Sequence, residues 1–152
     1  RMVEWARQET DMPAFADRPI EALSGGQRQR AWIAMAIAQD TEILFLDEPT
    51  SFLDVAHQMD VLTLVRHLNT AYGKTIVMVI HEINEAARFA DYLLAMKHGT
   101  LLYEGTPDEV FTKEMLADVF GVDAELLRDP RNDRPHCIPY VRDLTKEEKS
   151  YA

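Results

Sequence analysis

The distribution of apolar and polar residues along the chain predicts alternating helices and strands. Apolar residues recur at helical spacing from Val55 to Asn69, through Met59, Leu62, Val65 and Leu68, and this stripe predicts a helix with one buried face. Four apolar residues bounded by charges, at 43–46, fit a parallel strand that is buried on both faces, and the run 75–80 fits a second such strand. The pattern is typical of an α/β fold.

A further helix is predicted from Ser24 to position 38. Ser24 stands three residues before Gln27, which is the spacing of a capping box. Gly25 and Gly26 leave the first amides of this helix open to close approach, and a helix N-terminus carries partial positive charge. The start of the helix is therefore suited to bind a phosphate group.

The body of the same helix is apolar on every side at positions 31–38, so we expect it to be central and buried all round. Arg28 and Arg30 lie in its first turn, where a cation is unfavourable unless it meets an anion. Their partner is a nucleotide or a carboxylate, or else both arginines are simply solvated.

The rest of the chain predicts shorter elements. They are a helix within 1–12 followed by a loop, a helix at 82–90, an antiparallel hairpin of strands 92–96 and 101–104, a capped helix that begins at Thr106, a helix at 115–120 stopped by Gly121, and a polar, proline-bearing stretch from Asp129 with frayed residues 146–152.

Composition and charge exclude several classes of function. The 152 residues carry 26 acids against 16 bases, a net charge of −10, which disfavours nucleic acid as a partner. Cys137 is the single cysteine, so no disulfide forms within the chain and nothing indicates an oxidising compartment. No apolar run reaches the roughly 18 to 20 residues of a membrane helix. We therefore expect a cytosolic domain that meets a membrane only through a partner.

Candidate chemistry lies where the two predicted strands end. Asp47 and Glu48 follow the first strand and His81 follows the second. Because open α/β sheets bind ligands at the carboxyl ends of their strands, these side chains should face one crevice. One carboxylate can hold magnesium, and the other can orient or deprotonate water. Read singly, the acids also fit an ordinary turn, and the histidine fits a structural role.

Taken together, these motifs resemble those of the ATP-binding cassette (ABC) ATPases. Leu-Ser-Gly-Gly-Gln at 23–27, followed by the strand ending in Asp-Glu, matches the family's signature and Walker B motifs in their order. The resemblance is strong over 21–104. Residues 51–54 resemble the D-loop, with Phe52 where a small residue is common, and 81–87 resembles the H-switch. Asp54 fits equally well as the N-cap of the next helix.

The resemblance implies a fold and a set of boundaries. The expected fold is the C-terminal portion of a P-loop ABC-type ATPase domain, an α/β structure with a mostly parallel sheet flanked by helices. Residues 1–23 would end the helical subdomain, 24–128 would form the C-terminal part of the core, and 129–152 would form a tail. In the family's sheet order, the strand that leads into the phosphate-binding loop would lie between the strands at 75–80 and 92–96, and this chain is expected to lack it.

The resemblance also implies a role for each site residue in the binding and hydrolysis of ATP. Asp47 would hold Mg²⁺ through water, Glu48 would polarise the attacking water, and His81 would contact the γ-phosphate. Asp54 would make contact across a head-to-tail dimer with a second ATPase subunit. The signature residues would close over ATP bound to that other subunit; they are Ser24, Gly25, Gly26 and Gln27.

The tail carries a second, weaker resemblance. The segments 120–123, 129–130 and 136–140 look like the C-terminal end of ATPases that drive the uptake of ferric siderophores, other iron chelates and cobalamin. Such a protein would lie in the cytoplasm on the inner face of the cell membrane. Its partners would be integral-membrane permease subunits and, indirectly, a periplasmic or lipoprotein substrate-binding protein. His136 and Cys137 alone make a poor zinc site.

The chain contains no Gly-x-x-x-x-Gly-Lys-Ser/Thr sequence, the loop that cradles nucleotide phosphates. The family's glutamine loop and adenine-stacking aromatic are missing as well. We therefore expect the chain to be the C-terminal part of a longer ATPase and to be inactive alone. Two alternatives stay open: a non-transport ABC-type ATPase of DNA repair or chromosome structure, and a non-catalytic interaction module.

Overall fold

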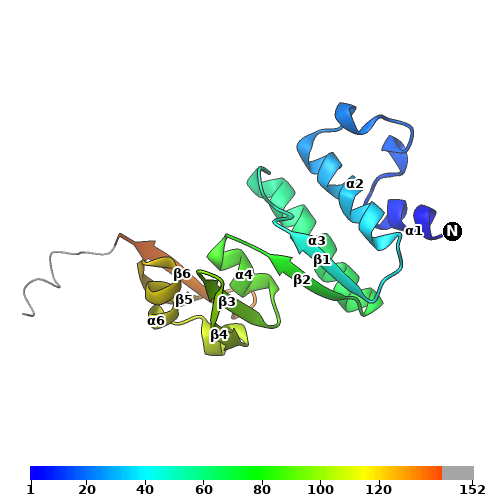
Figure 1. Cartoon of the computed structure of the whole chain (residues 1–152). Coiled ribbons are helices and arrows are strands. Elements are labelled where there is room, and N and C mark those ends of the chain that lie inside the picture. Colours follow the sequence, from blue (N-terminus) through cyan, green and yellow to red (C-terminus); the bar gives the residue numbers. More distant parts are fainter. Residues whose placement is uncertain (142–152) are drawn as a thin grey trace, which may run out of the picture. The chain divides into compact units, whose positions relative to one another are not determined.

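The computed structural model describes residues 1–141 and divides the chain into two compact units, Arg1–His81 and Glu82–Ala152 (Figure 1). The first unit contains α1 (Met2–Glu9), two short 3₁₀ turns (Pro13–Phe15 and Ile20–Ala22), α2 (Gly25–Ile37), β1 (Ile43–Asp47), α3 (Val55–Tyr72) and β2 (Thr75–Val79). The strands β1 and β2 pair in parallel, from Ile43 opposite Thr75 to Asp47 opposite Val79. The predicted helices and parallel strands of this unit are confirmed.

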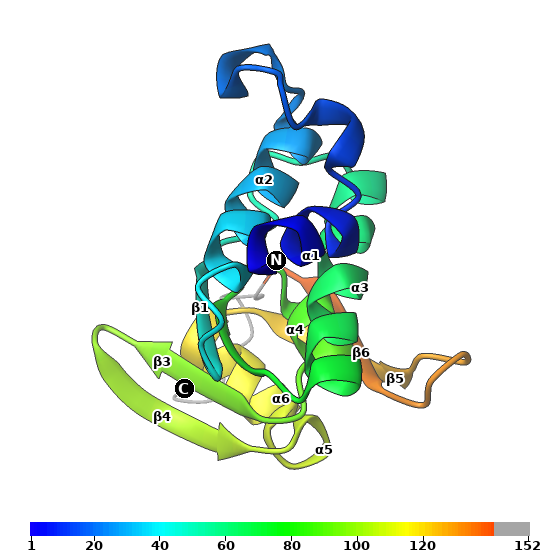
Figure 2. The ribbon, with the colours of Figure 1, turned by 90° about the vertical axis from the view of Figure 1, so that its right-hand side faces the viewer.

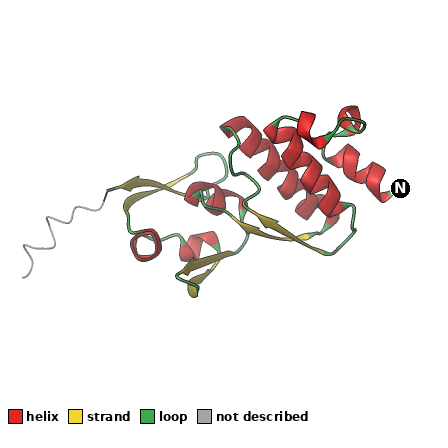
Figure 3. Ribbon diagram, turned by 45° about the horizontal axis from the view of Figure 1, so that its top comes forward, coloured by secondary structure: helices red, strands yellow, loops and turns green. Residues whose placement is uncertain are grey.

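The core of the first unit lies between its helices and one face of the β1–β2 sheet (Figure 3). Figure 2 shows α2 beside α1 and α3, which are the helices that it contacts. The buried side chains come from all three helices and from β1; they are Ala6, Ile33, Ala34, Ile37, Leu44, Val61, Val65 and Leu68. These contacts hold both strand ends and the start of α2 on one scaffold.

The expectation that the apolar segments are buried on every side is wrong. In α2, Ile33 is buried but Trp32 and Met35 are about half exposed, because α1 and α3 cover only part of its surface. In β1, Leu44 is 5% exposed whereas Phe45 is 75% exposed, because the helices cover one face of the sheet. An uninterrupted apolar run therefore does not by itself reveal burial on both faces.

The stripe predicted for α3 is partly corrected. Leu62, Val65 and Leu68 are buried as expected, but Val55 is exposed and Val61 is buried in its place. The helix ends at Gly73, which takes the left-handed conformation (φ 64°) of a C-terminal cap.

The second unit consists of two antiparallel hairpins and short helices. Its elements are α4 (Ile83–Phe89), β3 (Leu93–Lys97), β4 (Thr100–Gly105), α5 (Pro107–Val110), α6 (Lys113–Met115), a π-helical turn (Leu116–Phe120), β5 (Asp123–Arg128) and β6 (Pro135–Tyr140). The β3–β4 hairpin, the helix start at Thr106, whose amide donates to Glu109 Oε2 (2.8 Å), and the stop at Gly121 are confirmed. The core of the unit contains Ala87, Val110, Phe111, Met115, Leu116, Ala124 and Cys137.

The β5–β6 hairpin is an element that the sequence did not predict. Its second strand, β6, covers residues that were expected to form a polar stretch. The Asn84 side chain anchors β6, because it accepts a hydrogen bond from the amide of Cys137 (2.8 Å) and donates one to its carbonyl (3.0 Å). Cys137 is buried, and burial raises the pKa of its thiol. Residues 146–152, expected to be frayed, lie outside the described residues.

The α/β class is confirmed, but the strands do not form one mostly parallel sheet. Among residues 1–141 the structure has one parallel pair, β1–β2, and two antiparallel pairs, β3–β4 and β5–β6. Within residues 1–141, β2 pairs with β1 alone. The boundaries predicted after residues 23 and 128 remain predictions. In the described range, no helix is both long and apolar enough to cross a membrane.

Candidate functional site

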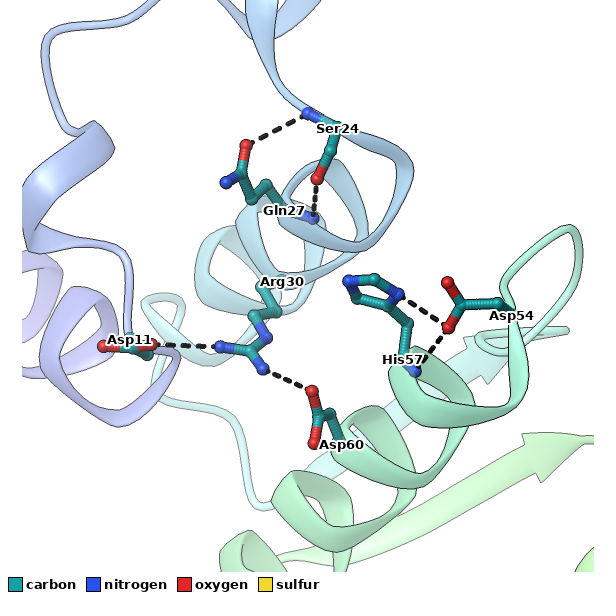
Figure 4. Close-up of polar contacts among 7 residues, drawn as sticks. All are labelled: Asp11, Ser24, Gln27, Arg30, Asp54, His57 and Asp60. Carbon is teal, nitrogen blue, oxygen red and sulfur yellow. Dashed lines mark hydrogen bonds and ion pairs between the residues drawn. The ribbon is translucent and has the colours of Figure 1, made fainter.

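The capping box at the start of α2 is confirmed. The Ser24 hydroxyl accepts a hydrogen bond from the amide of Gln27 (3.3 Å), and the Gln27 side chain accepts one from the amide of Ser24 (3.0 Å; Figure 4). Two of the first amides are thus satisfied within the box. The amides of Gly25 and Gly26 have no acceptor among residues 1–141. They remain available to an anion, which helix N-termini attract.

Gly26 also takes part in a close contact inside the unit. A Cβ atom on this residue would lie 2.3 Å from Cδ2 of His57, a separation that packed atoms do not adopt. A Cβ on Gly25 would meet only Leu53 at an ordinary 3.7 Å. The second glycine therefore has a structural reason besides the approach of a ligand, and this reason involves a histidine that the sequence did not single out.

The sequence left open whether Arg30 pairs with a nucleotide, pairs with a carboxylate or is solvated, and in the structure it pairs with two carboxylates. Its guanidinium contacts Asp11 at 3.2 Å and Asp60 at 2.9 Å, and the side chain is only 24% exposed (Figure 4). Arg30 lies in the second turn of α2, not in the first as expected, and its positive charge is paired with two anions of the same unit. Arg30 is a structural link between α2, α3 and the residues after α1.

The ends of β1 and β2 bring Glu48 and His81 together, as the parallel arrangement predicted. Glu48 Oε1 lies 2.6 Å from Nε2 of His81, and Glu48 Oε2 accepts a hydrogen bond from the Ser51 hydroxyl at 2.8 Å. The backbone amide of Glu48 donates to the carbonyl of Val79 (3.1 Å), which continues the strand pairing by one residue. Glu48 itself adopts a left-handed conformation (φ 48°). Such a conformation costs a non-glycine residue about 1 to 3 kcal/mol and is frequent at functional sites.

These hydrogen bonds favour the ionised form of Glu48. The bond from His81, followed by that from Ser51, lowers the pKa of the Glu48 carboxyl below its ordinary value. The side chain is therefore ionised at neutral pH. A carboxylate with a low pKa is a weak proton acceptor, so it suits the orientation of a water molecule better than its full deprotonation.

The side chain of Asp47 is exposed at the same strand end. No cluster of three or more histidine, cysteine, aspartate or glutamate side chains suited to a metal ion occurs among residues 1–141. A role for Asp47 in holding Mg²⁺ therefore stays a prediction.

The segment 51–54 after Glu48 is locally strained and ends in a cap. Phe52 has a left-handed backbone (φ 63°) and a fully exposed side chain. Asp54 Oδ1 accepts hydrogen bonds from the backbone amide of His57 (2.9 Å) and from its ring Nδ1 (2.7 Å), and these bonds lower the pKa of Asp54 (Figure 4). The N-cap interpretation of Asp54 is confirmed. A contact with another subunit remains a prediction.

Comparison with known proteins agrees with this geometry. Residues 1–51 match the family model described as ABC transporter. The chain is 56% identical, over 98% of its length, to the iron(3+)-hydroxamate import ATP-binding protein of Bacillus subtilis, of which it covers 55%. A solved ABC transporter assigned to the metal-chelate type superposes with a TM-score of 0.83 at 30% identity, over 91% of this chain and 56% of that one.

A dimeric ATP-binding cassette in a post-hydrolysis state, bound to ADP and phosphate, gives a TM-score of 0.61 at 34% identity, over 69% of this chain and 45% of that one. The chain therefore belongs to the ABC transporter family and has the fold of its ATPases. Its relatives within that family include ATP-binding subunits that serve the import of iron chelates. The chain spans about half the length of the curated relatives that it matches.

Proposed function

We propose that the chain carries part of the ATP-hydrolysing machinery of an ABC importer that takes up ferric siderophores or related iron chelates. One observation carries the hydrolytic part of this proposal. At the ends of two parallel strands, Glu48 Oε1 lies 2.6 Å from His81 Nε2, and Asp47 is the last residue of the first strand. The similarity to an iron-hydroxamate import protein supports the choice of substrate.

In the proposed mechanism the side chains act mainly by positioning and by charge. Glu48, ionised and held by Ser51, accepts a hydrogen bond from the attacking water and directs it to the γ-phosphate. His81 contacts that phosphate and leaves Glu48 when it does so. Asp47 would hold Mg²⁺ through water, and the ion would offset negative charge on the phosphates. The free amides of Gly25 and Gly26, with Ser24, close over ATP bound to a second subunit.

This arrangement implies partners and a location. Because the signature residues would act on nucleotide held by another chain, the working enzyme is a head-to-tail dimer in which Asp54 contacts the partner. The dimer would lie on the cytoplasmic side of the membrane against permease subunits, which receive substrate from a periplasmic or lipoprotein binding protein. The 152-residue chain lacks the phosphate-binding loop, so we expect no hydrolysis from this chain alone.

The decisive experiment is Glu48→Gln in the full-length ATPase. The variant should bind ATP, lose most of its turnover and accumulate as an ATP-bound dimer, because the water is no longer directed by a charged oxygen. Glu42→Gln, an exposed glutamate just before β1, is the matched control and should retain full turnover. Unchanged steady-state hydrolysis in Glu48→Gln would remove Glu48 from the mechanism.

Two further measurements test the remaining roles. His81→Ala should lower turnover more than nucleotide affinity, and a fully active variant would return His81 to a structural role. Deleting the gene should impair growth on ferric siderophores as the sole iron source. Normal uptake of every chelate tested, together with failure to take up an unrelated solute, would assign the protein to another importer branch.

A further inference from the structure

His57 lies in the first turn of α3 and contacts two separate parts of the candidate site. Its Nδ1 is 2.7 Å from Oδ1 of Asp54, at the end of the segment 51–54. Its ring edge covers Gly26 so closely that no side chain fits between them. The side chain is 45% exposed, so these contacts occur at the surface and not in the core. None of the sequence motifs includes this residue.

The two contacts complete a continuous path between the proposed catalytic pair and the start of α2. Glu48, which touches His81, accepts a hydrogen bond from Ser51, the first residue of the segment 51–54. At the other end of that segment Asp54 bonds to His57, and His57 covers Gly26. Leu53 adds an apolar contact by lying beside Gly25.

We propose that His57 is a positioning residue that fixes the segment 51–54 to the N-terminus of α2, so that Asp54 and the free amides of Gly25 and Gly26, which would all face the second subunit, keep their place relative to one another. This role rests on the proposed ATPase function. The bond to Asp54 sets the orientation of the imidazole, and the ring then sets the distance to Gly26. Misplacing a catalytic group by about 1 Å can reduce the rate by about 100-fold.

The kinetic test compares three His57 variants in the full-length ATPase. His57→Ala removes both contacts and should lower kcat about tenfold while KM for ATP changes less than about twofold, because a positioning defect acts on the transition state more than on binding. His57→Asn keeps a donor for Asp54, and His57→Phe keeps a ring over Gly26, so each should give an intermediate kcat. A kcat for His57→Ala within about twofold of wild type would overturn the proposal.

A double-mutant stability cycle tests the link, which is the contact between His57 and Gly26, without relying on activity. Gly26→Ala should lower the melting temperature in the wild-type background, because the new Cβ collides with the His57 ring. In the His57→Ala background the collision is gone, and alanine's better helix propensity should make the same change neutral or stabilising. Gly25→Ala, which meets only an ordinary contact, should behave alike in both backgrounds.

The outcomes separate failure of the link from failure of the proposed function. Equal effects of Gly26→Ala in the two backgrounds, in an enzyme that hydrolyses ATP, would overturn the link alone. A wild-type protein that hydrolyses no ATP would overturn the proposed function and with it the positioning role. Strong coupling in the cycle together with a selective loss of kcat supports both.

Discussion

The substitution Ser24→Ala separates the two roles that the structure gives to this serine. Its hydroxyl is the acceptor for the Gln27 amide at the start of α2, and the proposed function also places it against a phosphate. Alanine cannot accept this hydrogen bond, although the second bond of the capping box, from the Ser24 amide to the Gln27 side chain, can persist. The change should therefore weaken the helix start and the ATPase together.

The size of the stability effect follows from the geometry of the cap. Loss of an N-cap side chain costs about 0.5 to 2 kcal/mol. The Ser24 bond is long, at 3.3 Å, and exposed, so we expect a loss of about 1 kcal/mol. For a protein of 152 residues this corresponds to a fall in melting temperature of about 2 to 4 °C.

Ser24→Asp is the informative companion variant, because aspartate caps helices as well as serine does but repels phosphate. In thermal unfolding it should match wild type, while in the full-length enzyme its ATPase rate should fall at least as far as that of Ser24→Ala. Thr112→Ala removes a comparable cap from α6, distant in sequence from every site residue, and should cost stability without loss of turnover. An active Ser24→Asp enzyme would refute the phosphate-facing role of Ser24.

Three further outcomes are expected. Leu68→Ala, in the core of the first unit, should destabilise by about 2 to 5 kcal/mol in denaturant unfolding, whereas Thr63→Ala on the exposed side of α3 should be nearly neutral. The pKa of Glu48 is lowered in the folded state, so its ionised form contributes stability above the ordinary value of 4.5, and this contribution is lost as pH falls through the lowered pKa. A carboxyl titration followed by NMR should show the lowered pKa. His81→Ala should move the pKa back toward 4.5. Calorimetry on the 152-residue chain should detect no micromolar ATP binding, because the phosphate-binding loop is lacking; measurable binding would contradict this reasoning.

The features that could be predicted from sequence are those determined by short-range rules. Ser24 and Gln27 are close enough in the chain for capping chemistry to fix their contact. The meeting of Glu48 with His81 follows from parallel pairing, since each residue ends one of two neighbouring strands. In both cases a local pattern and one topological rule were sufficient.

The features that sequence reasoning missed depend on tertiary context. β6 contains Pro135 and Pro139, and proline argues against a strand unless the strand lies at an edge, as it does in this two-stranded pair. The contact of His57 with Gly26 joins residues far apart in the chain, and no spacing rule points to it. Gly26 belongs to the signature motif, where ligand approach already explains a glycine, so nothing in the sequence pointed to the packing reason.

The uncovered face of the β1–β2 sheet predicts how the 152-residue chain behaves when it is prepared alone. Four apolar side chains of the two strands, at 43, 45, 77 and 79, are between 43% and 75% exposed. Among the described residues the sheet has only these two strands, so unpaired backbone groups lie beside the apolar face. Exposed strand edges of this kind are templates for association with another chain.

We therefore expect the 152-residue chain to self-associate in a concentration-dependent way, as light scattering would measure. Phe45→Lys places a charge on the uncovered face and should shift the molecules toward monomer, because lysine opposes edge-to-edge pairing. Phe52→Ser removes an equally exposed aromatic that lies outside the sheet, and it should leave association unchanged. If Phe52→Ser makes the assembly dissociate while Phe45→Lys does not, then the segment 51–54 forms the contact between the chains. A chain that stays monomeric at every concentration would show that the exposed face needs no partner.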